Sequence, residues 1–225
     1  MKVAILQFPG SNRERDMIKA IKLVSGHSPS LVWHTNAELP DSDLYIIPGG
    51  FSYGDYLRSG ALAARSPIMN SLYDESKSGK RILGICNGFQ ILTEAGLLPG
   101  CFMKNKNLTF VCKLVCLEVS NNNNPFTLGY KRGEVIRLPV AHHNGNFFCD
   151  DQSLKEIEDN NQVAFRYAEG TNPNGSVNNI AGIFNSKGNI LGMMPHPENL
   201  VELTHGGEEG KRLFEGALNL LETEY

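Results

Sequence analysis

The sequence lacks the features that direct a chain to a membrane or to nucleic acid. Its 225 residues carry 21 lysines and arginines against 24 aspartates and glutamates, which gives a formal net charge of −3. A charge this small offers no bulk attraction for nucleic acid or for an anionic membrane surface. Every apolar run ends well short of the ~20 residues that a membrane-spanning helix requires. We therefore expect neither nucleic acid nor a membrane among the partners.

A signal peptide and a disulfide framework are also missing from the pattern. The apolar part of residues 1–8 is too short for a signal peptide and has no small-residue cleavage site, so residues 2–8 are predicted to form a strand. The five cysteines are an odd number and have no framework spacing. Reduced thiols in a cytoplasmic protein are the simpler interpretation.

Cys112 and Cys116 are separated by three residues, a spacing that is compatible with two metal ligands. The residues between them are predicted to be strand, and no second pair follows in the sequence. We therefore expect two buried structural thiols and no metal in this chain.

The first half of the chain alternates between strand and helix patterns. Residues 2–8 are followed by a Pro-Gly break and by a helix that extends to about residue 25, with Ser11 or Asn12 as its cap. Later elements are strands at 31–33, 44–47 and 81–85, a helix opened by Ser66 and Pro67 and stopped by Gly79, and a helix at 88–95. This order predicts an α/β fold with a mainly parallel central sheet flanked by helices.

The second half is richer in strands, with turn signals such as Asn144-Gly145 between them. Strands are predicted at 108–119, 135–140, 163–167, 180–184 and 190–194. A final helix from about residue 207 is predicted to bury Leu213, Phe214, Ala217, Leu218 and Leu221. No linker or internal repeat divides the sequence, so residues 1–225 are expected to form one domain.

Cys86 stands in the sharpest local signal, an apolar strand that enters Gly-x-Cys-x-Gly and then a helix. This is the nucleophile-elbow pattern with cysteine in place of serine. Gly84 and Gly88 leave room in the tight turn, and the helix directs its positive end at the sulfur, which favours the thiolate. The N–H of Asn87 is placed to donate to an oxyanion. The alternative is a buried structural cysteine whose glycine neighbours only permit close packing.

His196 and Glu198 follow the last strand in a Pro-His-Pro-Glu segment. The prolines fix the backbone, and residues two apart in an extended segment point to the same side. The carboxylate is therefore predicted to orient the imidazole as the second half of a triad. A lone histidine at a strand end is usually structural, but this locked pair favours a Cys86–His196–Glu198 amide or ester hydrolase.

A third strand ends in Pro48-Gly49-Gly50-Phe51, and no helical pattern follows at once. The N–H of Gly50 is the best candidate for a second oxyanion donor. A phosphate-binding loop or a plain turn is the alternative, and the lack of a following Lys-Ser/Thr disfavours a nucleotide P-loop.

These segments, in this order, resemble the class I, triad-type glutamine amidotransferases. The match is closer still to the glutaminase-subunit family of phosphoribosylformylglycinamidine synthase. It rests on residues 8–12, 14–16, 48–58, 84–90, 141–143, 145–146, 165–167, 172–176 and 194–198. The resemblance runs end to end, and its motifs are long and specific.

The resemblance implies a flavodoxin-like α/β domain that hydrolyses glutamine to glutamate and ammonia. Cys86, His196 and Glu198 would be the triad, Gly50 and Asn87 the oxyanion donors, and Phe51 and Gln90 the residues that bind glutamine. The family passes ammonia to a large ATP-dependent synthetase subunit, often through a small bridging subunit, in the fourth step of purine synthesis. ATP and Mg²⁺ are expected on that synthetase subunit, and no cofactor is expected in this chain.

Some positions stay open after this comparison. Arg13 and Ser59 stand where many relatives carry cysteine, which concerns packing or redox sensitivity and leaves the triad intact. His142 either contacts a partner or packs inside, and Tyr56 and Arg58 lie either at a partner surface or in a solvated loop. Another glutaminase or a cysteine peptidase on the same scaffold, or a non-catalytic binding subunit, are the alternative functions.

Overall fold

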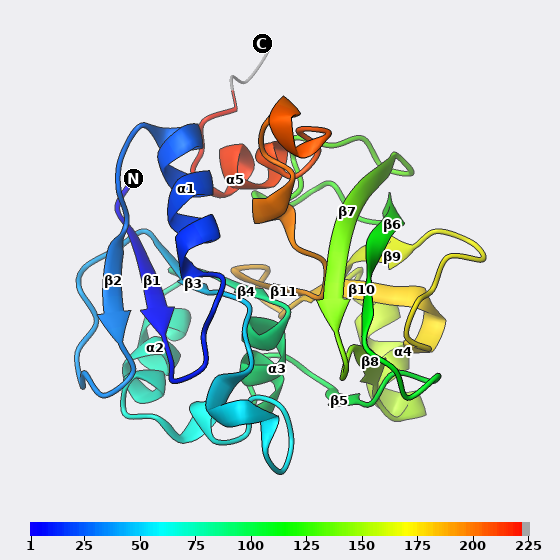
Figure 1. The fold of residues 1–225 in the computed structure, drawn as a ribbon, viewed down its shortest axis with the longest axis horizontal. Helices are drawn as coiled ribbons and strands as arrows, with labels where there is room; N and C mark the ends of the chain where they lie inside the picture. Colours follow the sequence, from blue (N-terminus) through cyan, green and yellow to red (C-terminus); the bar gives the residue numbers. More distant parts are fainter. Residues whose placement is uncertain (222–225) are drawn as a thin grey trace.

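Strands alternate with helices through the first half of the molecule in the computed structural model, which describes residues 1–221 (Figure 1). The strands are β1 (Val3–Gln7), β2 (Ser30–Trp33), β3 (Leu44–Ile47), β4 (Arg81–Ile85), β5 (Cys101–Met103), β6 (Val111–Val119), β7 (Val135–His142), β8 (Asn146–Phe148), β9 (Val163–Tyr167), β10 (Ile180–Phe184) and β11 (Ile190–Met193). The helices are α1 (Glu14–Ser25), α2 (Ile68–Lys77), α3 (Asn87–Glu94), α4 (Asp151–Asp159) and α5 (Lys211–Ala217).

One nine-stranded sheet runs through the described residues in the order β2-β1-β3-β4-β11-β10-β9-β6-β7. The five strands from β2 to β11 are parallel, and the four from β10 to β7 pair antiparallel. The predicted α/β class with a mainly parallel sheet and added antiparallel strands is confirmed. The inner parallel strands β1, β3, β4 and β11 are largely apolar and buried because helices cover them, whereas the edge strand β2 is mostly exposed.

The topology brings distant segments to one edge of the sheet. Strands β1, β3, β4 and β11 all run in the same direction, so their carboxyl ends meet there. Helices α1 and α5 lie side by side, and α1 also contacts the segment that follows β11 (Figure 1). The chain after each of these strands therefore enters the same small region.

Helix ends differ from the predictions for local physical reasons. Neither Ser11 nor Asn12 caps α1, since Arg13 is the residue before the helix and the Ser11 hydroxyl accepts the Phe8 N–H at 3.0 Å. The final helix begins at Lys211 and ends at Ala217. It buries three of the predicted residues, Leu213, Phe214 and Ala217. Beyond its end Leu218 is also buried, whereas Leu221 is half-buried.

Strand predictions in the second half were also incomplete. Leu108 has a positive φ of 58° and belongs to a turn, so β6 begins only at Val111. The small antiparallel sheet of β5 and β8 and the helix α4 were not predicted. Helix α4 does carry a recognisable start signal, because the Asp150 carboxylate caps it by accepting the Ser153 N–H at 2.9 Å.

Candidate active site

Cys86 lies in the turn between β4 and α3, at the carboxyl edge of the sheet. Its φ of 51° and ψ of −104° are values that residues other than glycine rarely adopt. The N–H of Cys86 donates to the carbonyl of Met193 at 2.8 Å, which ties the turn to β11. The strand–turn–helix context predicted for this elbow is confirmed.

The two glycines that flank Cys86 are required by close packing. A Cβ on Gly88 would lie 2.0 Å from the carbonyl oxygen of Ile47, and a Cβ on Gly84 would lie 2.5 Å from Leu92 Cδ1. Helix α3 therefore approaches β3 and β4 so closely that no side chain fits at either position. This close approach places the first turn of α3, with its free N–H groups, directly beside Cys86.

His196 and Glu198 form a buried pair after β11. The imidazole Nδ1–H donates to Oε1 of Glu198 at 2.7 Å, and the two residues are 3% and 1% exposed. The predicted extended geometry of this segment was wrong in part. His196 is non-helical (φ −104°, ψ 88°), as its position before Pro197 requires, but Pro197–Asn199 forms a short 3₁₀ helix. This turn, and not strand alternation, returns the carboxylate to the imidazole.

The surroundings of His196 favour its protonated form. Burial disfavours the imidazolium, but Glu198 and Cys86 outweigh that cost and raise the pKa of His196 to about 10. Since Nδ1 is bound to Glu198, Nε2 is the atom left for proton transfer. Among the described residues Nε2 has no hydrogen-bond partner. The arrangement supplies a cationic acid beside a cysteine.

Two backbone N–H groups near Cys86 have the character of oxyanion donors. The N–H of Asn87 is in the first turn of α3, where no intrahelical acceptor exists. The N–H of Gly50 donates to no carbonyl of the described chain, although its neighbour Phe51 donates to Gly10 at 2.9 Å. The side chain of Asn87 accepts the Ser52 N–H at 3.1 Å, which binds the Gly50 loop to α3.

A cavity of about 60 Å³ opens beside Cys86. It is lined by Asn12, Arg13, Gly50, Phe51, Cys86, Phe110, Ala141 and His196. The structure thus brings Phe51, Gly50, Cys86 and His196 together, as predicted. Gln90 is absent from this lining, because its carboxamide accepts from Asn87 at 2.9 Å and donates to the Asn144 carbonyl at 2.6 Å.

Behind the cavity lies a network of buried amides around His142, which the sequence reasoning missed. His142 is 2% exposed, and its Nδ1–H donates to Asn105 Oδ1 at 3.1 Å. The same oxygen accepts the Gly145 N–H at 2.9 Å, and Asn174 faces His142 Nε2 at 3.4 Å. Burial, with a smaller effect from His196, lowers the pKa of His142 to about 4. His142 therefore packs inside as a neutral residue.

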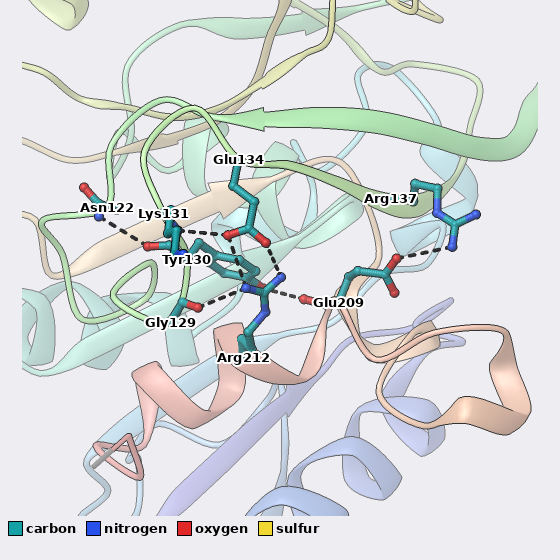
Figure 2. A network of polar contacts seen from close by, with 8 residues as sticks. All are labelled: Asn122, Gly129, Tyr130, Lys131, Glu134, Arg137, Glu209 and Arg212. Carbon is teal, nitrogen blue, oxygen red and sulfur yellow. Dashed lines mark hydrogen bonds and ion pairs between the residues drawn. The ribbon is translucent and has the colours of Figure 1, made fainter. Parts of the chain in front are cut away.

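The segment after the triad is held from outside by a charged network (Figure 2). Arg212 donates to both oxygens of Glu134, at 2.6 and 3.2 Å, and lies over the ring of Tyr130. Tyr130 donates its hydroxyl proton to the Glu209 carbonyl at 2.7 Å, and the N–H of Gly210 donates to Leu200. These contacts fix the chain that follows the Glu198 turn against the loop between β6 and β7.

A larger hollow of about 550 Å³ lies at the opposite edge of the sheet, where Lys2, Ser30 and Asp43 are among its lining residues. It contains no cysteine, so we assign the chemistry to the smaller cavity. Within residues 1–221 no cluster of three metal-ligating side chains is present. Cys112 is exposed and Cys116 only half-buried, so the expectation of two buried thiols was wrong. Cys112 lies on β6 near the edge of the sheet, where β7 is its outer neighbour.

No helix of the described chain is both long and apolar enough to cross a bilayer.

Comparisons with known proteins agree with this geometry. Residues 1–214 match the CobB/CobQ-like glutamine amidotransferase domain. Phosphoribosylformylglycinamidine synthase subunit PurQ of Rhizobium meliloti is 61% identical over 221 residues, and that of Rhizobium etli is 59% identical over 221 residues. Each alignment covers 98% of this chain and 99% of the relative. A chain of the solved PurLQS structure from Thermotoga maritima superposes with a TM-score of 0.89 at 44% identity, covering 98% of this chain and 99% of that one.

Proposed function

Because the chain belongs to the CobB/CobQ-like glutamine amidotransferase family, we propose that Cys86, His196 and Glu198 release ammonia from glutamine. The chain is the glutaminase subunit of phosphoribosylformylglycinamidine synthase, the enzyme to which its 59–61% identical relatives belong. The observation that supports these roles best is the buried His196–Glu198 pair at 2.7 Å, whose free Nε2 lies at the Cys86 cavity.

The first half of the reaction follows from the charges at the site. The Cys86 thiolate adds to the side-chain amide carbon of glutamine, and the N–H groups of Gly50 and Asn87 hold the oxyanion. Losing one such donor typically costs ~10²–10³ in rate. Protonated His196 then gives its Nε2 proton to the departing ammonia, which leaves a glutamyl thioester.

The second half returns the enzyme to its starting state. His196, now neutral and oriented by Glu198, takes a proton from water, and the resulting hydroxide attacks the thioester to release glutamate. The chemistry uses side chains, backbone N–H groups and water. ATP and Mg²⁺ belong to the synthetase subunit, where formylglycinamide ribonucleotide becomes formylglycinamidine ribonucleotide. Residues 1–225 act as one cytoplasmic domain in this scheme.

The mouth of the cavity carries apolar surface suited to a protein partner. Phe51 and Phe110 line the opening with ring centroids 6.4 Å apart, and they are 39% and 50% exposed. On the loop after Phe51, Tyr56 and Leu57 are 75% and 88% exposed. Contiguous exposed apolar residues of this kind mark interaction sites. We assign this surface to the large synthetase subunit, with a small bridging subunit completing the complex.

In the free chain the cavity is small and the Gln90 carboxamide is engaged in internal contacts. Docking would open the Gln90 carboxamide to glutamine and shield ammonia from protonation. The isolated chain is therefore expected to be a poor glutaminase.

The experiment compares glutamate release by the isolated chain and by the chain mixed with its synthetase and bridging subunits. A glutamine-analogue electrophile should label Cys86, and glutamine should protect it. Equal rates with and without partners would contradict the coupling, and labelling of another residue would contradict the assignment of Cys86.

A further inference from the structure

We propose that Arg13 binds the α-carboxylate of glutamine and thereby selects for α-amino acid amides. This inference rests on the proposed glutaminase function, and it adds a substrate contact that lies outside the triad and the oxyanion donors. It rests on the position of the Arg13 side-chain stem at the cavity, on the charge of the cavity lining and on the contacts of the first turn of α1.

Arg13 is fixed at the rim of the cavity by its backbone. Its N–H donates to the Gly49 carbonyl at 3.3 Å, and Asn12 donates to the same oxygen. The stem of Arg13 lies close to His196. A Cβ atom placed on Gly49 would lie 3.2 Å from Arg13 Cγ and 2.8 Å from His196 Cε1. Arg13 and His196 therefore flank Gly49, and both line the cavity beside Cys86.

The cavity lining favours an anion at this rim. Arg13 and His196 are its ionisable groups besides Cys86, and no aspartate or glutamate is among the lining residues. His196 is committed to Glu198 and to the leaving ammonia. Once the amide of glutamine is placed at Cys86, the opposite end of the substrate carries a carboxylate that requires a cation. Arg13 is the lining cation not used by the chemistry.

One hydrogen bond orients the Arg13 guanidinium, and its other N–H donors have no partner in the described chain. Its Nη1 donates to Asp16 one turn along α1 at 3.0 Å, and the two side chains are 37% and 38% exposed. In the described chain the other guanidinium nitrogens donate to no protein group. Arginine binds carboxylates through a planar pair of N–H groups, which are the groups left over here. Asp16 thus holds the side chain while leaving room for a second carboxylate.

The test uses the assembled synthase and two substrates, glutamine and 4-aminobutanamide, which is glutamine without its α-carboxylate. Arg13→Gln should lower kcat/KM for glutamine about 10- to 100-fold, chiefly by raising KM, because it removes a charge-assisted hydrogen bond. The same variant should leave kcat/KM for 4-aminobutanamide within about threefold, because that substrate never uses the bond. Arg13→Lys keeps the charge and should restore part of the loss.

Arg15→Gln is the matched control, since Arg15 is an exposed arginine in the first turn of α1, which Arg13 precedes, and lies outside the cavity lining. This variant should leave kcat/KM unchanged for both substrates. An equal loss for both substrates in Arg13→Gln, or no loss for either, would overturn the inference. If the assembled wild-type synthase releases no glutamate from glutamine, the proposed function fails instead, and the two failures are thereby distinguished.

Discussion

Two buried histidines near Cys86 have pKa values that their surroundings shift in opposite directions. His196 is 3% exposed and faces the Glu198 carboxylate, and its pKa is raised to about 10. His142 is 2% exposed and faces the amides of Asn105 and Asn174, and its pKa is lowered to about 4. Equal burial therefore gives a cation in one region and a neutral ring in the other.

The difference shows that burial alone does not define a catalytic residue. An anionic partner outweighs desolvation at His196, whereas the amides around His142 offer hydrogen bonds but no compensating charge. His196 can therefore exchange a proton during turnover. His142 donates its Nδ1 proton to Asn105 Oδ1, the oxygen that also accepts the Gly145 N–H. The carbonyl of the neighbouring Asn144 accepts from Gln90. The amide network around His142 has a structural role, and the His196–Glu198 pair carries out proton transfer.

The sharpest way to break this comparison is to place the same substitution at both histidines. His196→Asn should lower kcat for glutamine in the assembled synthase on the order of 10⁶-fold, because the proton donor is lost. His142→Asn is the control and should retain most of the activity, since it removes no proton-transfer group. The measurement is glutamate release. Comparable losses in both variants would contradict the division of roles.

Glu198→Gln tests whether the Glu198 carboxylate is what raises the pKa of His196. Removing the carboxylate should lower kcat about 10⁴-fold, and it should also lower the pKa of His196 from about 10. His196 must be protonated to release ammonia, so the alkaline fall of activity should move to lower pH. A pH–rate profile checks this shift. Glu208→Gln, at an exposed carboxylate, is the control, and an unmoved alkaline limb in Glu198→Gln would contradict the account.

The low pKa of His142 should make the free energy of unfolding fall at acid pH. Its folded pKa of about 4 lies below its ordinary value of 6.5, so the unfolded chain takes up the proton first. The stability that neutral His142 supports is present above pH 6.5 and is lost as the pH falls through about 4, by up to ~3 kcal/mol. Urea unfolding of the wild type and of His142→Asn should show a shallower pH slope in the variant. Identical slopes would contradict the assignment.

Arg212→Gln should have the smallest effect. It removes the contacts to Glu134 and Tyr130 that hold the chain after the Glu198 turn (Figure 2). The pair is partly exposed, so we expect a loss of less than ~1 kcal/mol in the free energy of unfolding. Arg132 is an exposed arginine in the loop that carries Tyr130 and Glu134, and Arg132→Gln should leave the free energy of unfolding unchanged. A loss of glutaminase activity without a loss of stability would contradict this structural role.

The sequence predicted the parts of the site that depend on local backbone chemistry. Cys86 and its flanking glycines form a strand–turn–helix unit of a few residues, so its geometry is set by neighbours in the chain. The His196–Glu198 pairing was predicted as well, although the short 3₁₀ helix at Pro197–Asn199 was not. Parallel strand patterns gave the sheet edge where these segments meet.

The parts that escaped prediction depend on distant contacts. Asn105, His142 and Asn174 are far apart in the sequence, and no local pattern indicates that they share one network. Gln90 was predicted to bind substrate, but its present contacts come from Asn87 and from the remote Asn144. The exposure of Cys112 likewise follows from the position of β6 near the sheet edge, which alternation within a strand does not reveal.

The central claim is that Cys86 makes ammonia and that the partner subunit consumes it. The direct measurement is amidine synthesis by an assembled synthase that carries Cys86→Ser, supplied either with glutamine or with an ammonium salt. The account predicts no synthesis from glutamine and wild-type synthesis from ammonium salt. Undiminished synthesis from glutamine, or loss of synthesis from both nitrogen sources in an intact complex, would contradict it.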